Sequence, residues 1–588
     1  MAGFEYDVVI AGASFGGVAA ALAAASDPKV RVVLLEAGTW AGGQATSQGL
    51  TRWDETKMDL TETTCSAKSY RELRDAIRDW YRQNATLSAA GKQQTYFNPG
   101  SASPGNPFRA DPNVVRTVID GLLDAAAPRL DVKYGVRVTA VTLNGGLVQS
   151  VTVNGGDTYA GNVFIDATDL GDLLPLCAGL AWTIGAESFA DTQERDAPPE
   201  AHPEWIQPIT VPIALELRPA GESHPIVKPD GYEQIVIDQN FHVVDGDINS
   251  VITVKPPGSE TVWDYRRYVD KRNFADPDYA CDRSTLNVGS NDYQAATIPT
   301  GDAQQDAAII EQARTVSIAF AYWLQTDVEH DDDPTQKGYP NLMVRTDAFD
   351  RDDGTAPAPY IRESRRIDAE ERIVRQDIDP ADLPPGSVRA KMFADSCGIG
   401  FYGIDVHPAT GPGTEEHNFG TLPFQIPLGS LLPKSLSNFV AGCKNIGATH
   451  LTSGAYRVHP VEWAIGEAAG VLAAFCTTQN IAPKDTYKDP ARVVALQTRV
   501  LERGAPIFWW ADVPFENNER AFAAIHLCGV RGIFEGDGQT LDFQPGDELS
   551  QAGRDAVDER VGRQLPWPDQ TLTRADAAVW ICEQLGFL

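Results

Sequence analysis

Three histidines lie in glycine-rich or polar stretches where a side chain could exchange a proton with a small molecule. His407 closes the stretch DSCGIGFYGIDVH at residues 395–407, and His450 and His459 lie in GATHLTSGAYRVH at residues 447–459. Histidine suits general acid–base chemistry because its ordinary pKa is close to neutral pH. We favour His407 and His459 as catalytic residues, although a structural hydrogen bond is the commoner role of such a side chain.

Two further side chains in these stretches could act on a substrate oxygen. Tyr402 and Arg457 carry a phenol and a guanidinium that could polarise or orient it. The nearby run RESRRI also contains three arginines at residues 362, 365 and 366. We expect these three to pair with carboxylates as a structural cluster rather than to clamp an anion. The glycine content of residues 395–407 predicts a loop there.

A glycine turn near the N-terminus could hold the phosphates of a nucleotide. Residues 7–20 read DVVIAGASFGGVAA, where Gly12 and Gly17 take the outer positions of G-x-G-x-x-G and Ser14 replaces the middle glycine. An apolar strand is expected before the turn (6–11), a helix after it (18–26) and a second strand beyond (31–35), closed by Glu36. That order allows a tight turn, phosphates at the helix N-terminus, and a carboxylate about twenty residues on for the ribose. Ser14 is small enough to be tolerated, and its hydroxyl could donate to a phosphate.

The residues after Glu36 carry a more specific signal. Residues 37–55 read AGTWAGGQATSQGLTRWDE, which resembles the G-G-Q-x-T-x-x-G stretch of FAD-dependent oxidoreductases with a glutathione-reductase-like FAD fold. VFIDATDLGD at 163–172 and NFVAGCKNIGATHLTSGAYRVHPVEWAIGEAAG at 438–470 resemble later segments of the same family. The resemblance extends from residue 5 to about 475.

This resemblance implies an α/β fold with a Rossmann-like FAD-binding domain and FAD as the cofactor. A helix expected at 461–474 would point its N-terminus at the flavin and favour its reduced, negatively charged form. The residues that the resemblance and the glycine turn assign to the cofactor are Gly12, Ser14, Gly16, Gly17, Glu36, Ala37, Gly42, Gly43, Gln44, Thr46, Val138, Ala167, Thr168, Asp169, Gly442, Asn445, Ile446 and Ala455.

The chain divides by pattern into four stretches. Residues 1–204 and 426–488 form the FAD-binding domain, and 205–425 form an inserted β-rich substrate domain, with alternating patches such as QIVIDQ and INSVITVK and a helix at 303–324. Residues 489–588 are a small, mainly helical appendage whose ADVP, GIFEG and LTRAD runs resemble S-layer homology modules. We expect that appendage to serve packing or dimerisation rather than to bind a cell-wall polymer.

The amino-acid composition limits the kinds of partner that the protein is expected to bind. The formal net charge is −32, which disfavours nucleic acid and anionic membranes. Eight scattered cysteines without a C-x-x-C pair indicate neither a metal site nor a dithiol motif, and they fit reduced thiols in a cytoplasm. We see no signal peptide and no apolar run long enough for a membrane span, so a cytoplasmic location is favoured over the cell surface.

The function expected is hydride transfer from a small organic substrate to flavin N5. No second strand–G-x-G-x-x-G–helix unit is visible between residues 180 and 430, so oxygen or another acceptor would reoxidise the flavin. The alternative is a cell-wall-associated binding protein with a catalytically inert flavin domain. A flavoprotein that modifies RNA conflicts with the acidity. A hydrolase built on the G-x-S-x-G letters around Ser14 conflicts with the position of that turn after the first strand. The chain could form a homodimer.

Overall fold

The computed structural model describes residues 3–56, 64–103, 105–244, 246–253, 259–410, 414–534, 536 and 539–588. Its centre is a five-stranded sheet in which all hydrogen-bonded neighbours run parallel. In spatial order the strands are β19 (Phe439–Ala441), β8 (Val163–Asp166), β2 (Val8–Ala11), β3 (Val32–Glu36) and β4 (Leu130–Tyr134). Distant parts of the chain therefore meet in one sheet, as the sequence predicted for residues 6–11, 31–35, 163–166 and 438–442.

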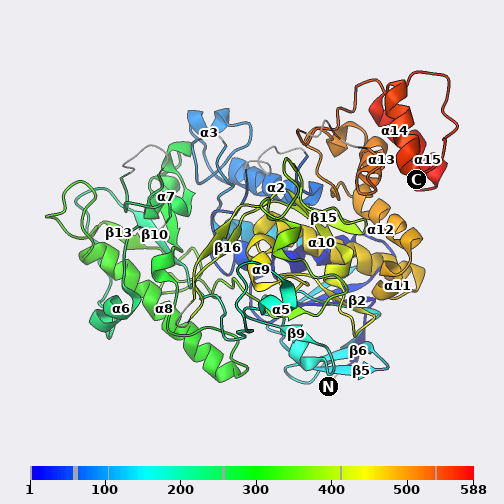
Figure 1. Cartoon of the computed structure of the whole chain (residues 1–588). Coiled ribbons are helices and arrows are strands. Elements are labelled where there is room, and N and C mark those ends of the chain that lie inside the picture. Colours follow the sequence, from blue (N-terminus) through cyan, green and yellow to red (C-terminus); the bar gives the residue numbers. More distant parts are fainter. Residues whose placement is uncertain are drawn as a thin grey trace.

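Helices α1 (Phe15–Ala25) and α10 (His459–Gln479) pack closely against each other beside this sheet (Figure 1). The approach is possible because both helices present small residues. A Cβ atom on Gly466 would overlap the carbonyl oxygen of Gly16, and one on Gly470 would overlap that of Ala20. The strands are buried on both faces, which a parallel sheet requires. The alanine-rich composition of α1 thus serves the contact with α10.

Further elements extend the N-terminal part of the chain. A second sheet has the order β1 (Gly3–Glu5), β7 (Thr158–Ala160), β6 (Leu147–Val153) and β5 (Val138–Asn144). The helices that follow β3 in the chain are α2 (Lys68–Asn84), α3 (Ala89–Gln93) and α4 (Pro112–Ala125). Strand β5 was expected slightly earlier, at 135–141. Its first residue is Val138.

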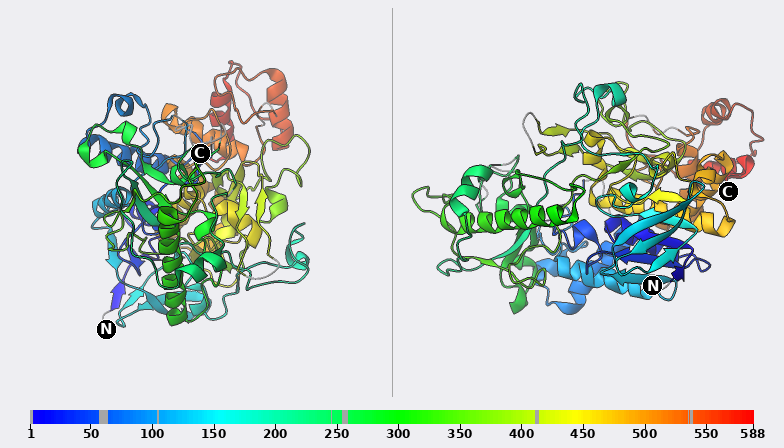
Figure 2. Two further views of the ribbon diagram at one scale, coloured as in Figure 1. Left: turned by 90° about the vertical axis from the view of Figure 1, so that its left-hand side faces the viewer. Right: turned by 90° about the horizontal axis from the view of Figure 1, so that it is seen from below.

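The inserted region is built on an antiparallel sheet with long helix α8 (Ala303–Thr326) packed beside it. Its strands are β11 (Arg267–Val269), β12 (Asp282–Leu286), β10 (Ile213–Leu217) and β13 (Leu342–Val344), and it also holds α7 (Val262–Tyr265). The view from below in Figure 2 shows α8 at one end of the molecule and the C-terminal helices at the other.

Neither of the two strand patches predicted in this region is a strand: residues 248–253 of INSVITVK form only an isolated bridge at Ile248, and residues 254 and 255 lie outside the described residues. QIVIDQ lies in helix α6 (Tyr232–Gln239), which begins after Gly231 and ends before Asn240, both in the left-handed region. Its β-branched residues favour a strand, but packing against α8, including the Tyr232–Tyr322 ring contact, overrides that local preference.

The loop predicted at 395–407 is also wrong. Residues 396–400 form β15 (Ser396–Gly400), which pairs with β18 (Phe424–Pro427), and β16 (Ile404–Val406) pairs with β17 (His417–Phe419). The glycines there make room for neighbouring side chains: a Cβ atom on Gly400 would overlap the ring of Phe424, and one on Gly398 would lie 2.9 Å from Ile426 Cδ1. His407 therefore follows a strand end.

The C-terminal part of the chain is helical and projects from one end of the molecule (Figure 1). It holds α11 (Pro483–Tyr487), α12 (Pro490–Glu502), α13 (Glu519–Gly529), α14 (Gln551–Val561) and α15 (Arg574–Leu585). Shorter elements elsewhere are α5 (Phe189–Thr192), α9 (His450–Tyr456), the pair β9 (Trp182–Thr183) and β14 (Arg366–Ile367), and the 3₁₀ turn η1 (Gly43–Ala45).

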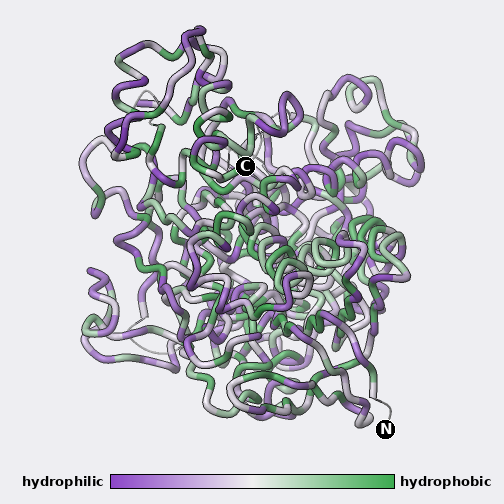
Figure 3. Tube along the Cα trace, turned by 90° about the vertical axis from the view of Figure 1, so that its right-hand side faces the viewer, coloured by the Kyte–Doolittle hydropathy of each residue, from purple (hydrophilic) through white to green (hydrophobic). Residues whose placement is uncertain are grey.

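Hydropathy follows this architecture. The most hydrophobic stretches gather inside the molecule, and hydrophilic stretches dominate the peripheral loops (Figure 3). In the described ranges, no helix combines the length and the apolar character needed to cross a bilayer.

Candidate active site

A cavity of about 320 Å³ opens beside the Gly12 turn. The sequence-predicted residues that line it are Gly12, Ser14, Glu36, Ala37, Val138, Thr168 and Asp169. The rest of the wall includes Gln48, Leu170 and Asp172 from the segments that resemble the family, Arg137 from the strand predicted at 135–141, and residues 357–359 and 361, which the sequence did not single out. The ends of three neighbouring strands, β2, β3 and β8, thus meet one elongated opening, which is where open α/β sheets bind ligands.

The turn itself requires glycine at its first position. Gly12 has φ of 91°, and a Cβ atom there would overlap the backbone of Ala167 and Thr168. Ser14, the departure from the glycine pattern, is the N-cap of α1: its Oγ accepts the N–H of Gly17 at 3.1 Å. A serine cap stabilises a helix start. The substitution therefore keeps the turn and satisfies one of the free N–H groups of the helix.

The start of α1 retains N–H groups for a ligand. Gly16 donates to Glu462 Oε1 at 3.0 Å, while the N–H groups of Ser14 and Phe15 find no acceptor among the described residues. Unpaired donors at a helix N-terminus attract phosphate. A turn that excludes a Cβ at Gly12 and keeps two unpaired N–H groups at the helix start fits the diphosphate of a dinucleotide.

Glu36 lies at the end of β3, on the wall of the same cavity. Its carboxylate accepts the N–H groups of Ala13 at 2.7 Å and Gly38 at 2.6 Å. Burial raises the pKa of Glu36, and these two hydrogen bonds oppose the rise. Each carboxylate oxygen keeps a lone pair, so Glu36 can also accept hydroxyl donors such as those of a ribose.

The loop that carries Gly42 to Thr46 folds back on the Gly12 turn. Gly42, at φ of 107°, donates to Ala13, and a Cβ on Gly43 would lie 3.0 Å from Ser14 Cα. Gln44 is fully buried and donates to the carbonyl of Arg457 at 3.0 Å, while Thr46 bonds inside its own loop to Ala41. Gln44 Oε1 has no hydrogen-bond partner among the residues that the structure describes, which leaves a buried acceptor for a ligand or water.

A buried ion-pair cluster connects the Gln44 loop with residues that follow β8 and β19. Lys444 pairs with Asp169 and lies 3.4 Å from Glu462, and Gln44 donates to the same Glu462 carboxylate. Burial lowers the pKa of Lys444, but the two carboxylates raise it further, so the ammonium stays charged. Asp169, Cys443 and Glu462 bring ligand-type atoms within 4.8 Å of one another, and the Lys444 ammonium lies beside both carboxylates.

Several of the predicted cofactor residues form hydrogen bonds with Asp166 beside the cavity. Gly442 donates to Asp166 at 2.8 Å, and Asn445 Nδ2 donates to the same carbonyl at 2.9 Å. Thr168 Oγ1 donates to Asp166 Oδ1. The remaining members, Ala167, Ile446 and Ala455, are buried.

His407 forms a buried carboxylate–histidine pair at the end of β16. Its Nδ1 lies 2.7 Å from Asp292 Oδ2, and Asp292 is 1% exposed and also accepts Arg362 at 2.8 Å. Burial raises the pKa of Asp292, but Arg362 and His407 lower it further, so the carboxylate is ionised. His407 Nδ1 must then carry the proton. The imidazole is 26% exposed, and among the described residues its Nε2 forms no hydrogen bond, although Asp405 lies 3.9 Å away.

Arg457 is the residue that follows α9, and it lies near the His407–Asp292 pair. It bonds to Asp405 Oδ2 at 3.1 Å and to the Tyr360 hydroxyl, and its carbonyl accepts Gln44. Asp405 also lies 3.9 Å from His407 Nε2. Tyr402 is partly buried; burial and the nearby Asp54 raise its pKa. Arg457 and His407 are therefore brought together through Asp405, and Gln44 connects them to the cavity loop.

His459 lies apart from that pair in an aromatic cage. It stacks on Trp53 with ring centroids 5.5 Å apart, and its Nδ1 accepts the N–H of Asp54 at 3.1 Å. Burial lowers the pKa of His459 to about 3, with Asp54 acting in the opposite direction. The ring is neutral at pH 7, and its basic nitrogen is already occupied.

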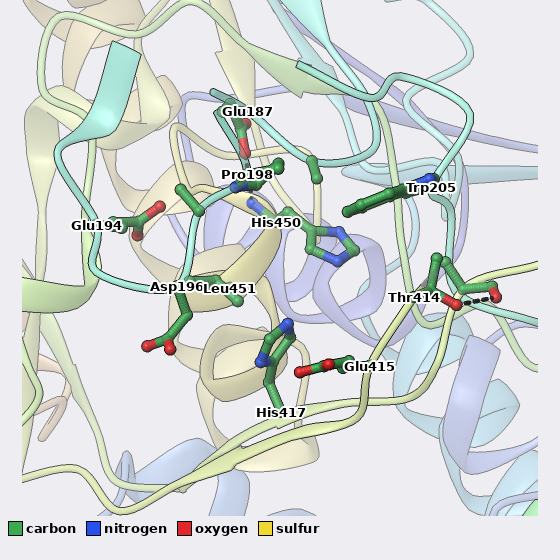
Figure 4. Close-up of a pocket in the computed structure, with 13 residues that line it drawn as sticks. Glu187, Glu194, Asp196, Pro198, Trp205, Thr414, Glu415, His417, His450 and Leu451 are labelled. Atoms are coloured by element: carbon green, nitrogen blue, oxygen red, sulfur yellow. Dashed lines mark hydrogen bonds between the residues drawn. The ribbon is translucent and has the colours of Figure 1, made fainter. Parts of the chain in front are cut away.

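His450 faces a different, water-sized cavity of about 30 Å³. Figure 4 shows its ring pointing toward His417 across that space, with Trp205 and several carboxylates around it. His450 Nδ1 bonds to Glu363 Oε1 at 2.9 Å. Burial opposes ionisation of Glu363, but His450 and Arg366 lower its pKa to about 2. His450 is thus separated from His407 and does not join its pair.

The three arginines of RESRRI pair with carboxylates, as the sequence predicted. Arg362 bonds to Asp292 at 2.8 Å, Arg365 to Asp172 at 3.2 Å, and Arg366 to Glu187 at 2.8 Å and to Glu363 at 2.7 Å. Sequence analysis did not find the acidic partners. The two acids Glu462 and Glu467 within a largely apolar helix were the available signal for Glu462, and Glu363 lies within RESRRI itself, but nothing local indicates the partners of Asp292 or Glu363.

A family model described as FAD dependent oxidoreductase matches residues 7–499. No curated protein matches the chain in sequence. One similar solved structure is a geranylgeranyl bacteriochlorophyll reductase-like protein from Thermoplasma acidophilum, with 9% identity, TM-score 0.32, and coverage of 99% of this chain and 100% of that one. Another is NikD, an amino acid oxidase of nikkomycin biosynthesis, with 16% identity, TM-score 0.22, and coverage of 38% and 61%.

A third is L-proline dehydrogenase from P. horikoshii, with 13% identity, TM-score 0.16, and coverage of 32% of this chain and 26% of that one. The chain therefore spans less than two thirds of two of these three structures, 61% of NikD and 26% of L-proline dehydrogenase. The family match ends before α13, so the resemblance of residues 489–588 to S-layer homology modules stays a prediction, as do the four domain boundaries.

Proposed function

The chain belongs to the FAD-dependent oxidoreductase family, and on that premise we propose that it oxidises a small alcohol, amine or sugar, with His407 taking the substrate proton. FAD is the cofactor. When bound, it supplies the two-electron acceptor that receives a hydride from the substrate. All other roles in the proposal belong to this chain's own side chains and backbone.

The cavity beside the Gly12 turn is the proposed FAD site. The free N–H groups of Ser14 and Phe15 would hold the diphosphate, and Glu36 would accept the ribose hydroxyls. Val138 and Arg137 line the end of the cavity next to Glu36 and would contact the adenine. The glycine turn, the free N–H groups at the start of α1, and a Glu36 carboxylate that can accept further hydrogen bonds together match that nucleotide's chemistry.

His407 is the proposed general base. Because Asp292 fixes the proton on Nδ1, the lone pair of a neutral ring lies on Nε2, the nitrogen that forms no hydrogen bond among the described residues. An O–H or N–H of the substrate would pass its proton there, and the buried Asp292 carboxylate would stabilise the imidazolium that forms. The Asp292–His407 contact at 2.7 Å is the observation that carries this proposal.

Arg457 is the proposed orienting residue. Its guanidinium is held by Asp405 and Tyr360, so it is fixed in place before a substrate arrives. A fixed planar donor can position a substrate oxygen relative to His407, and such positioning accelerates a reaction. Oxygen or another external acceptor would take the electrons from the cofactor afterwards.

The proposal is tested by anaerobic bleaching. FAD-loaded protein is mixed without oxygen with panels of alcohols, amines and sugars, and the visible flavin absorption is followed. We expect members of one panel to bleach the band and oxygen to restore it. Flavin-loaded protein that no member of the three panels bleaches would contradict the proposed substrate classes.

A further inference from the structure

Two thiols meet between the C-terminal helices α13 and α15. The Sγ atoms of Cys528 and Cys582 lie 3.7 Å apart, and both residues are fully buried. Each thiol also faces a carbonyl one turn earlier on the opposite helix: Cys582 Sγ lies 3.5 Å from Ala524 O, and Cys528 Sγ lies 4.0 Å from Ala578 O. The two side chains therefore point at each other across the helix interface.

The other cysteines have different surroundings. Cys443 bonds to Glu462, Cys476 to Thr486, and Cys397 to the carbonyl of Ile426. Within the residues that the structure describes, Cys528 and Cys582 are the one pair in sulfur–sulfur contact. Eight scattered cysteines gave no pairing in the sequence, because these two are separated by most of the C-terminal region.

We propose that Cys528 and Cys582 form an intrachain disulfide bond that joins α13 to α15. The two thiols lose two electrons and two protons to a disulfide oxidant such as glutathione disulfide, which becomes two glutathione thiols. One cysteine first forms a mixed disulfide with glutathione, and the other displaces it. A disulfide is about 2.05 Å long, so the sulfurs move together by less than about 2 Å.

Access to the buried pair requires local opening of the contact between α13 and α15. Folded proteins open locally in this way at a lower free energy than that of global unfolding. The contact with Cys582 and burial raise the pKa of Cys528 well above its usual range, while the Arg531 guanidinium acts in the opposite direction. The Cys528 thiol is thus protonated in the folded chain, and oxidation proceeds slowly through the locally opened helix contact.

The bond stabilises a part of the chain that lies beyond the family match. It closes the segment from 528 to 582, which contains α14, and so restricts that segment in the unfolded chain. We expect the unfolding temperature of the C-terminal helices to rise by at least about 4 °C on oxidation. The FAD site is elsewhere, so the flavin spectrum should not change.

The test uses the full-length, FAD-loaded protein in buffers of increasing glutathione disulfide content. Free thiols are alkylated, and the protein is digested with trypsin without reduction. We expect the peptides 521–531 and 575–588 to appear as one linked species, lighter than their sum by two hydrogen atoms, while the other six cysteines remain alkylated.

Matched variants complete the experiment. Cys528→Ala and Cys582→Ala should each abolish the linked peptide and the thermal shift, whereas Cys281→Ala, a buried cysteine of the inserted region, should leave both unchanged. If wild-type protein keeps both thiols at the most oxidising ratio, carries glutathione on them without ring closure, or links them to other cysteines, the proposal is overturned.

Discussion

Two regions of the site are built from different kinds of chemical group. One is the cofactor cradle, formed by the Gly12 turn and Glu36, and the other is the reacting face, formed by His407, Asp292, Asp405 and Arg457. The cradle consists of backbone N–H groups, glycines and one carboxylate, most of them within the first fifty residues. The reacting face consists of side-chain ion pairs between remote segments: His407 and Asp292 are 115 residues apart in the chain. The comparison teaches that the cradle depends on backbone shape, whereas the face depends on individual charges.

The largest effect of a substitution is expected in the cradle, where the shape of the backbone determines whether FAD binds. Gly12→Ala places a methyl group into the backbone of Ala167 at a positive φ, so we expect loss of FAD binding or of folding. The measurement is the flavin content of purified protein. Gly121→Ala is the matched control, because a Cβ there meets nothing within 4 Å and α4 should gain about 0.5–1 kcal/mol. Normal flavin content in Gly12→Ala would show that the turn does not govern binding.

The reacting face should respond to a single charge. Asp292→Asn removes the anion beside His407, so we expect flavin reduction by a bleaching substrate to slow by about 10²-fold or more. The imidazolium that forms on His407 also loses its counter-ion, so the pH dependence of the reduction rate should change. Thr210→Val removes another contact of Asp292 without changing its charge and controls for packing. An unchanged pH profile in Asp292→Asn would argue for a purely structural pair.

Glu36→Gln sharpens the comparison within the cradle, since it changes charge but keeps shape. Replacing a carboxylate that accepts ribose hydroxyls should weaken FAD binding by about tenfold to a hundredfold, through loss of about 1.5–3 kcal/mol of charge-assisted hydrogen bonding. Titration of the apoprotein with FAD measures it. The rate of flavin reduction at full FAD occupancy should stay near that of the wild type. A slower rate at unchanged affinity would place Glu36 in the chemistry instead.

The smallest effect concerns acid stability. Burial lowers the pKa values of His459 and His526 to about 3, below the ordinary value of histidine. Between about pH 6.5 and 3 the unfolded chain therefore binds more protons, and stability should fall as the pH falls, by up to about 1.4 kcal/mol per pH unit for each ring. Denaturant unfolding from pH 7 to 5.5 tests this. His526→Leu should flatten the dependence without affecting FAD, and an unchanged slope would contradict the neutral, buried ring.

The same contrast explains what could be predicted from the sequence. The strand, turn, helix and Glu36 follow one another locally, so glycine spacing and apolar runs predict them. Ser14 departs from the G-x-G-x-x-G pattern, yet it is compatible with the turn because its side chain caps α1. The strands at 396–406 were missed because their glycines make room for Phe424 and Ile426, which are distant in the sequence.

The partners on the reacting face could not be predicted for a related reason. Glu363 and Asp405 lie inside the quoted runs RESRRI and DSCGIGFYGIDVH, but no local motif indicates their partners or that of Asp292, and only the folded chain brings these acids to His450, Arg457 and His407. Histidine as a residue type was a sufficient signal to name candidates. It could not separate the exposed ring of His407 from the caged ring of His459.

The most direct test of this account is the rate of anaerobic flavin reduction in His407→Gln at full FAD occupancy. We expect the variant to bind FAD as tightly as the wild type and to be reduced by the same substrate at least about 10²-fold more slowly. Reduction at the wild-type rate would contradict the assignment of the proton to His407, even though the FAD site would stand.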